Sequence, residues 1–288
     1  MANVQAQIQP KIGPTGRVDR VIPAPRKLES HGPARIIAMC NQKGGVGKTT
    51  STINLAAALA RYGRRVLAVD FDPQGALSAG LGVPAHEVPT IYDLMLGKVK
   101  DPREAIQHTG TPGLDLIPAN IDLSAAEVHL VTEVAREQIL GSVLRKVVDD
   151  YDVILVDCQP SLGLLTVNAL TASHGVLIPL ACEYFALRGV ALLVETIEKV
   201  KDRLNPALAL DGILATMYDS RTLHAREVLD RVVETFGDSV FDTVIGRTVK
   251  LPDAQIAAKP VIDYAPANPA SESYLKLARE LVERGIVA

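Results

Sequence analysis

The chain has 288 residues, of which 48% are hydrophobic, and a formal net charge of −3 at pH 7. This length and apolar content allow one or two domains with a large core, and the small negative charge excludes a basic field over the whole surface that would attract nucleic acid. Aromatic residues make up 4% of the chain, which argues against a surface for stacking single-stranded bases. The three cysteines and six histidines have none of the spacings of a disulfide framework, a zinc site or an iron–sulfur site.

Residues 1–34 form a segment of distinct composition, with five prolines and no aromatic residue. Through Arg35 there are six basic and two acidic residues, so this stretch carries a net charge of +4. Because such a sequence buries too little apolar surface to offset the entropy lost on ordering, we expect a flexible, proline-rich basic arm over 1–34 and one folded domain over 35–288. The N-terminus lacks the apolar region of a secretory signal, and no apolar stretch approaches the roughly 18 residues of a membrane-spanning helix, so we expect a cytoplasmic protein.

From Arg35 onward, short apolar runs alternate with segments of helical periodicity. The expected strands are Ile36–Cys40, Arg65–Asp70, Leu114–Pro118, Val153–Asp157, Gly175–Leu180, Gly212–Met217 and Val240–Ile245. The expected helices are 48–61, 136–149, 161–172, 188–204, 222–236 and 271–285. Near-continuous apolar strands are typical of sheets covered on both faces, and their alternation with helices predicts an α/β fold with a doubly wound, mostly parallel sheet flanked by helices.

Residues 42–50 read Gln-Lys-Gly-Gly-Val-Gly-Lys-Thr-Thr and lie between the first expected strand and the first expected helix. Glycines in this context let backbone N–H groups converge on phosphate at a helix N-terminus. Lys48 would reach the β- and γ-phosphates, and the Thr49 hydroxyl would ligate Mg²⁺. The general pattern has glycine where this chain has Gln42, and the plain alternative is a glycine turn between strand and helix. The residues expected to hold the nucleotide here are Gly44, Gly45, Val46, Gly47, Lys48, Thr49 and Thr50.

Two further expected strands end in carboxylates, which places acid at the carboxyl edge of the sheet, where open α/β folds bind ligands. One continues through Asp70-Phe-Asp72-Pro-Gln-Gly75, and the other ends at Asp157. Asp157 fits the role of holding Mg²⁺ through water. An Asp-Pro turn that merely ends a strand is the alternative for Asp72, but the phosphate loop favours the functional reading. We expect Asp70 to be structural.

The run Lys43-Gly-Gly-Val-Gly-Lys-Thr49 resembles the deviant Walker A loop of the ParA/MinD family of P-loop NTPases. The resemblance implies that Lys43 crosses a dimer interface to the partner's nucleotide, and that Asp72 orients the attacking water beside Lys48. It also assigns Asp157 to the Walker B position. One departure is Gln159-Pro160, where the family usually has two prolines. This difference leaves the assignment of Asp157 intact and bears on how the following loop moves with the nucleotide state.

Two more segments, Tyr218–Thr222 and Val244–Asp253, resemble ParA segments whose basic residues contact DNA phosphates. The resemblance carries this role to Arg221 and Lys250, with Arg247 nearby. Departures are Lys250 in place of arginine, Gly246 in place of proline, and the sequence of 253–258. Residues 217–260 hold six basic and seven acidic side chains, so solvated surface arginines remain the alternative. By the same resemblance, Met217 and Pro252 would flank the adenine.

The resemblance covers residues 35–288 and implies an ATPase that uses ATP and Mg²⁺ and forms an ATP-dependent homodimer. The dimer would bind double-stranded DNA non-specifically, associate with the nucleoid, and segregate a chromosome or plasmid with a ParB-like protein. One alternative is a relative that positions a protein cargo. Another is a MinD-like membrane switch, but acids match bases in the C-terminal helix, so no stable membrane association is expected. A reductase-type ATPase of the superfamily would need cluster-binding cysteines that this chain lacks.

Overall fold

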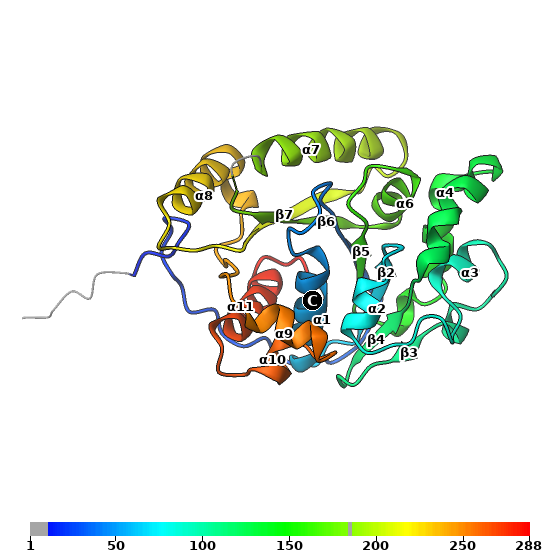
Figure 1. Ribbon diagram of the computed structural model, residues 1–288, viewed down its shortest axis with the longest axis horizontal. Helices are drawn as coiled ribbons and strands as arrows, with labels where there is room; N and C mark the ends of the chain where they lie inside the picture. Colours follow the sequence, from blue (N-terminus) through cyan, green and yellow to red (C-terminus); the bar gives the residue numbers. More distant parts are fainter. Residues whose placement is uncertain (1–10, 184–185) are drawn as a thin grey trace, which may run out of the picture.

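The computed structural model describes residues 11–183 and 186–288. Its centre is a seven-stranded sheet in the order β3-β4-β2-β5-β1-β6-β7, in which every pair is parallel except β3 with β4 (Figure 1). The strands are β1 (Arg35–Met39), β2 (Val66–Phe71), β3 (Gln107–His108), β4 (Leu114–Ile117), β5 (Val153–Cys158), β6 (Gly175–Ala181) and β7 (Ala209–Thr216). Parallel pairing brings the carboxyl ends of β1, β2 and β5 to one edge.

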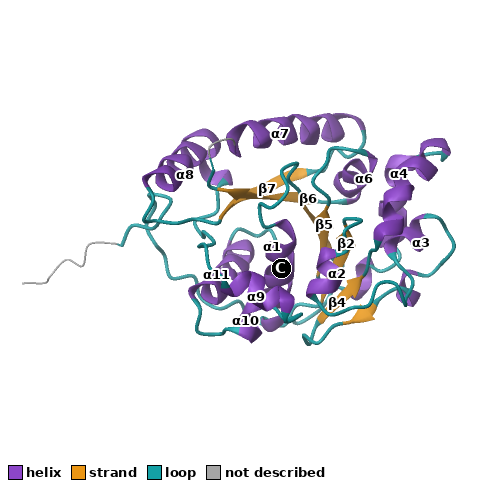
Figure 2. Ribbon diagram, viewed as in Figure 1, coloured by secondary structure: helices purple, strands orange, loops and turns teal. Residues whose placement is uncertain are grey.

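Helices cover both faces of this sheet, as Figure 2 shows. They are α1 (Lys48–Arg61), α2 (Ala76–Gly80), α3 (Ile91–Met95), α4 (Ala126–His129), α5 (Ile139–Leu144), α6 (Leu164–Ala172), α7 (Ala186–Arg203), α8 (Leu223–Phe236), α9 (Lys250–Ile256), α10 (Val261–Tyr264) and α11 (Pro269–Glu283). Helices α1, α2 and α9 to α11 pack on one face, and α3 to α8 pack on the other.

The period of two along each strand explains the continuous apolar runs. In β1, Ile36 and Ala38 join the core on the α6 side, whereas Ile37 and Met39 join the core on the α1 side. The same alternation holds in β5, where Ile154 faces the first core and Leu155 the second. Both faces of the sheet are therefore buried, and the predicted doubly wound, mostly parallel fold is confirmed.

Some expected elements differ from the structure. Residues Val240–Ile245 form two isolated backbone bonds with β7 and no strand, because buried Glu280 of α11 accepts the N–H groups of Asp242 and Thr243 instead. The expected helix 136–149 is broken into α5 and two single 3₁₀ turns. The two-residue strand β3 was not among the expected strands, because it is too short to show a periodicity.

Residues 11–34, expected to be part of a flexible arm, lie against the domain in this structure (Figure 1). Ile22 is buried, and Gly32 N–H donates to the carboxylate of Asp152 at 2.9 Å. His31 Nδ1 lies 2.8 Å from the same carboxylate. The boundary expected at residue 34 therefore does not divide a packed domain from a separate arm; residues 1–10 lie outside the described residues. No helix within the described ranges is long and apolar enough to cross a membrane.

Candidate functional site

The glycine-rich loop of residues 41–47 joins β1 to α1 at the carboxyl edge of the sheet. Gly45 and Gly47 have φ of +73° and +86°, a backbone region that side chains with a Cβ rarely adopt. Asn41 fixes the start of the loop, since its amide donates to the Pro179 carbonyl at 2.8 Å and its oxygen accepts from Lys43 N–H at 3.0 Å. The Asn41 side chain thus holds the start of the loop against β6.

Lys48 opens α1 and is almost fully buried, with 6% of its surface exposed. Its Nζ donates to the Lys43 carbonyl at 3.2 Å, so the ammonium group lies within the curve of the loop. Burial lowers the pKa of Lys48, and the nearby Asp157 opposes that shift. A buried cation beside the backbone of a glycine-rich loop is suited to an anionic ligand.

Asp70 of β2 and Asp157 of β5 are register partners on adjacent strands, and both are buried. Asp70 is satisfied by Ser78, whose N–H and hydroxyl donate to it at 2.8 and 2.7 Å. Asp157 Oδ1 accepts from the Thr52 hydroxyl at 3.3 Å, while its Oδ2 has no hydrogen-bond partner among the described residues. Burial raises the pKa of Asp157 to about 8 and that of Asp70 to about 7.

The unpartnered Oδ2 of Asp157 bears on whether this site fits a metal ion. A buried carboxylate with one unpartnered oxygen is costly unless a proton, or a cation with its water, neutralises the group. The Thr49 hydroxyl is close enough to stabilise the same carboxylate, so an oxygen donor pair is present beside Lys48. Hydroxyl and carboxylate oxygens are the ligands that Mg²⁺ accepts, usually with water completing its shell. The residues expected to hold Mg²⁺ therefore fit that ion.

Asp72 lies just beyond β2 and is half-buried. Its Oδ1 accepts from Gln74 N–H and its carbonyl accepts from Gly75 N–H, both at 3.0 Å, so the Asp-Pro turn of the alternative reading is present. The Asp72 charge nevertheless acts on both Lys48 and Asp157, which places it at the same edge as the loop. The turn and the proposed water-orienting role are therefore compatible.

Lys43 lies on the outer side of the loop and is partly exposed. It forms an ion pair with Glu183, two residues beyond the end of β6 in the same chain. Its role across a dimer interface stays a prediction, because the structure contains one chain.

A cavity of about 290 Å³ opens next to the loop. Gly47 and Thr50 line one side, and Met217 and Pro252 line another, so the two residues expected near the adenine do meet the phosphate loop. The Thr216 hydroxyl donates to the Val46 carbonyl at 2.8 Å and ties the end of β7 to the loop. The rest of the wall was not expected at this cavity, although most of it lies in the segment Val244–Asp253, which the sequence assigned to DNA. It is formed by Ile245, Gly246, Arg247, Thr248, Leu251, Gln255 and Tyr274, with Thr216.

The basic residues expected to contact DNA are only partly brought together. Arg221 and Arg247 line one surface groove of about 570 Å³, because Arg247 N–H donates to the Tyr218 carbonyl at 3.0 Å and pairs the two segments. Lys250 lies outside that groove, at the start of α9, and contacts Asp253 at 3.3 Å. The groove thus joins segments that are some 25 residues apart in the sequence.

Arg221 also carries its own counterion. It donates to both oxygens of Asp219, at 2.8 and 2.7 Å, and this pairing lowers the pKa of Asp219 to about 2. Within the described ranges, the Arg247 guanidinium has no carboxylate at ion-pair distance. Of the two arginines in the groove, Arg247 is therefore the one whose charge is less compensated.

The fold and this site define a P-loop ATPase. A family model described as an AAA domain matches residues 34–210. A curated relative, the chromosome-partitioning ATPase Soj of Treponema pallidum, is 50% identical over 87% of this chain and 98% of its own length. An uncharacterised protein of Mycobacterium tuberculosis is 58% identical over 95% of this chain and 86% of its own. The chain belongs to this AAA-domain family and, within it, to the Soj/ParA group of partition-type ATPases.

A solved structure shares the fold. A Mycobacterium smegmatis protein described as cobyrinic acid a,c-diamide synthase, with bound ADP and magnesium, superposes with a TM-score of 0.78 at 40% identity. The match covers 88% of this chain and 96% of that one. The name of this neighbour differs from those of the Soj relatives, so the likeness establishes the common fold, and its ligands belong to that protein.

Proposed function

We propose that the protein is an ATP-hydrolysing switch that binds ATP with Mg²⁺ and dimerises when ATP is bound. The observation that carries this proposal is that buried Lys48 and buried Asp157, whose Oδ2 has no partner among the described residues, lie at one glycine-rich loop. The base would occupy the 290 Å³ cavity between the loop and residues Met217 and Pro252. The loop N–H groups and Lys48 would bind the phosphates.

Thr49 would hold Mg²⁺ directly and Asp157 through water. The ion, when bound, neutralises charge on the phosphoryl oxygens. Asp72 would accept a hydrogen bond from the attacking water and orient it toward the γ-phosphate, releasing ADP and inorganic phosphate. Lys48 stabilises the negative charge that spreads over the transferred phosphoryl group. This division of roles leaves Asp70 as a structural residue that holds Ser78.

Lys43 would complete the site of a second copy. In the single chain it is paired with Glu183, and crossing to the partner's nucleotide requires that this exposed pair separate. Exposed ion pairs are weak, about 0–1 kcal/mol, so a bound polyphosphate can replace Glu183. ATP would in this way join two chains, and hydrolysis would separate them.

The dimer would bind duplex DNA without reading sequence, through phosphate contacts from Arg221, Arg247 and Lys250 of both chains. A ParB-like protein would stimulate hydrolysis, and repeated cycles on the nucleoid would segregate a chromosome or plasmid. The Soj and ParA relatives support this direction.

The testing experiment is retention of a random-sequence duplex by the purified protein with no nucleotide, ADP or ATP, at two salt concentrations. ATP-dependent, salt-sensitive retention is expected. Asp72→Ala should bind ATP, dimerise and hold DNA without turnover, and normal turnover by that variant would remove Asp72 from the mechanism. No retention with any nucleotide, with ATP-dependent dimerisation intact, would replace the DNA role with a protein-cargo or membrane switch.

The name of the 40% identical neighbour favours one other use of ATP, the amidation of a carboxylate. An amide synthase consumes ATP only with its acid and a nitrogen donor present. ATP turnover by the protein with DNA alone would exclude that activity. Turnover that requires cobyrinic acid and glutamine or ammonia would instead overturn the proposed switch.

A further inference from the structure

Residues 11–19 form a small hairpin on the surface, which we call the N-terminal hairpin. Ile12 and Val18 make an isolated antiparallel bridge, and Asp19 N–H donates to the Lys11 carbonyl at 2.7 Å. At its tip, Gly16 N–H donates to the Gly13 carbonyl at 3.1 Å. The hairpin is thus closed by its own backbone and has a defined shape.

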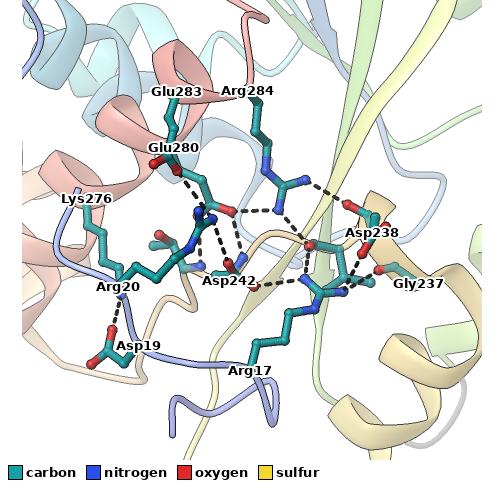
Figure 3. A network of polar contacts seen from close by, with 12 residues as sticks. Arg17, Asp19, Arg20, Gly237, Asp238, Asp242, Lys276, Glu280, Glu283 and Arg284 are labelled. Carbon is teal, nitrogen blue, oxygen red and sulfur yellow. Dashed lines mark hydrogen bonds and ion pairs between the residues drawn. The ribbon is translucent and has the colours of Figure 1, made fainter. Parts of the chain in front are cut away.

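Arg17 fastens the N-terminal hairpin to the segment after α8. Its guanidinium donates to the carbonyl oxygens of Gly237 and Val240 at 2.6 and 2.8 Å and to Asp242 Oδ1 at 2.8 Å (Figure 3). Arg284, at the end of α11, reaches the same segment and donates to Val240 at 2.9 Å (Figure 3). One arginine from the hairpin and one from α11 therefore hold the same carbonyl.

The ion pairs of this network cancel one another. Asp19 pairs with Lys276 of α11, and Arg20 pairs with Asp242 and with Glu283 at 3.6 and 3.3 Å. Five basic and five acidic side chains take part, namely Lys11, Arg17, Arg20, Lys276 and Arg284 with Asp19, Asp238, Asp242, Glu280 and Glu283. The hairpin and the residues that hold it therefore form a network of fixed shape with no net formal charge.

The tip of the hairpin lies on the groove that contains the two arginines. Pro14 lines this groove together with Arg221 and Arg247, and Asn268 and Ser273 line it from α11 and the residue before it. Pro14 itself is exposed. Residues Gly246–Thr248 line both this groove and the 290 Å³ nucleotide cavity, so one segment separates the two.

We propose that the N-terminal hairpin is one wall of the groove that receives a phosphate backbone of duplex DNA, with Pro14 at the contact and Arg17 as the residue that positions it. This inference rests on the proposed DNA binding and adds a surface outside the segments of the family resemblance. Because the charges of this network balance, the hairpin guides the backbone toward Arg247 by shape. The arginines supply the attraction.

The test measures duplex retention by the full chain with ATP over a range of salt concentrations. Pro14→Glu places a carboxylate against the backbone and should weaken retention about tenfold through like-charge repulsion. Pro14→Lys should strengthen retention and steepen the slope of log affinity against log salt by about 0.9, one phosphate contact. Val21→Glu is the matched control, because Val21 is 97% exposed and does not line the groove, and it should stay within about twofold of the wild type.

Arg17→Ala tests the positioning role. Releasing the hairpin should weaken retention several-fold while leaving the salt slope unchanged, whereas Arg221→Ala should lower the slope by about 0.9. Once the hairpin is released, Pro14→Glu should add little further loss, and Arg17→Lys should restore part of the affinity. ATP binding and dimerisation, measured on each variant, distinguish a groove effect from misfolding.

Equal retention by Pro14→Glu and Val21→Glu, with Arg221→Ala impaired, would overturn the hairpin wall and leave the proposed function standing. Additive losses from Pro14→Glu and Arg17→Ala would overturn the positioning role of Arg17. A wild-type protein that dimerises with ATP and retains no duplex would overturn the proposed DNA binding itself.

Discussion

The nucleotide site and the arginine groove are built in opposite ways. At the nucleotide site, Lys48, Asp70 and Asp157 are buried, and burial shifts the pKa of each. In the groove, Arg221 is exposed and already paired with Asp219. Solvent screens the groove charges, whereas little solvent reaches Lys48 and Asp157. Single substitutions should therefore have large effects at the nucleotide site and small, salt-dependent effects in the groove.

The largest effect is expected for Lys43→Ala. Removing a cation that acts only on the transferred phosphoryl group should lower ATP hydrolysis about 10²–10³-fold and leave ATP binding intact. Single-turnover hydrolysis and nucleotide binding, measured side by side, check this. Lys146→Ala is the control, since Lys146 is exposed and lies near Lys100, away from the loop. Wild-type hydrolysis by Lys43→Ala would exclude a role across the dimer interface.

Lys48→Ala should reduce the affinity for ATP about a hundredfold. The reason is that a buried ammonium group inside the loop interacts with phosphate in a medium of low dielectric constant. Equilibrium titration with a fluorescent ATP analogue measures this loss. If ATP binds as tightly to Lys48→Ala as to the wild type, the loop is a structural turn.

Arg247→Ala should reduce DNA retention about fivefold and lower the salt slope by about 0.9, because one phosphate contact is lost. Lys250→Ala provides the internal comparison, since Lys250 lies outside the groove and beside Asp253. We expect a smaller loss from it. A larger loss from Lys250→Ala than from Arg247→Ala would move the DNA surface from the groove to α9.

The smallest effect, and the one of opposite sign, is expected for Asp219→Asn. This change frees the Arg221 guanidinium and should strengthen DNA retention about two- to threefold. Because pairing lowers the pKa of Asp219 to about 2, the carboxylate stays ionised from pH 8 down to pH 5, and acidification over that range should not mimic the substitution. Weaker retention by Asp219→Asn would show that Asp219 positions Arg221 and does not compete for it.

Sequence alone predicted the elements that depend on residues close together in the chain. The helix expected at 48–61 is α1, Lys48–Arg61, and the loop before it lies where its glycines predicted. Asp157 could be placed beside this loop because strands of a parallel sheet end at one edge. A continuous apolar run predicts a buried strand, and the residue that ends the run is then expected at the edge of the sheet.

Tertiary structure decided what depends on contacts between distant segments. The composition of residues 1–34 predicted a flexible arm, but Arg17 and Arg20 pair with Asp242 and Glu283, carboxylates more than 200 positions away. A long-range contact also explains why Val240–Ile245 is not a strand, since Glu280 accepts the N–H groups of Asp242 and Thr243. Long-range ion pairs and side-chain acceptors leave no period in the sequence, so only the folded chain shows which charges remain available.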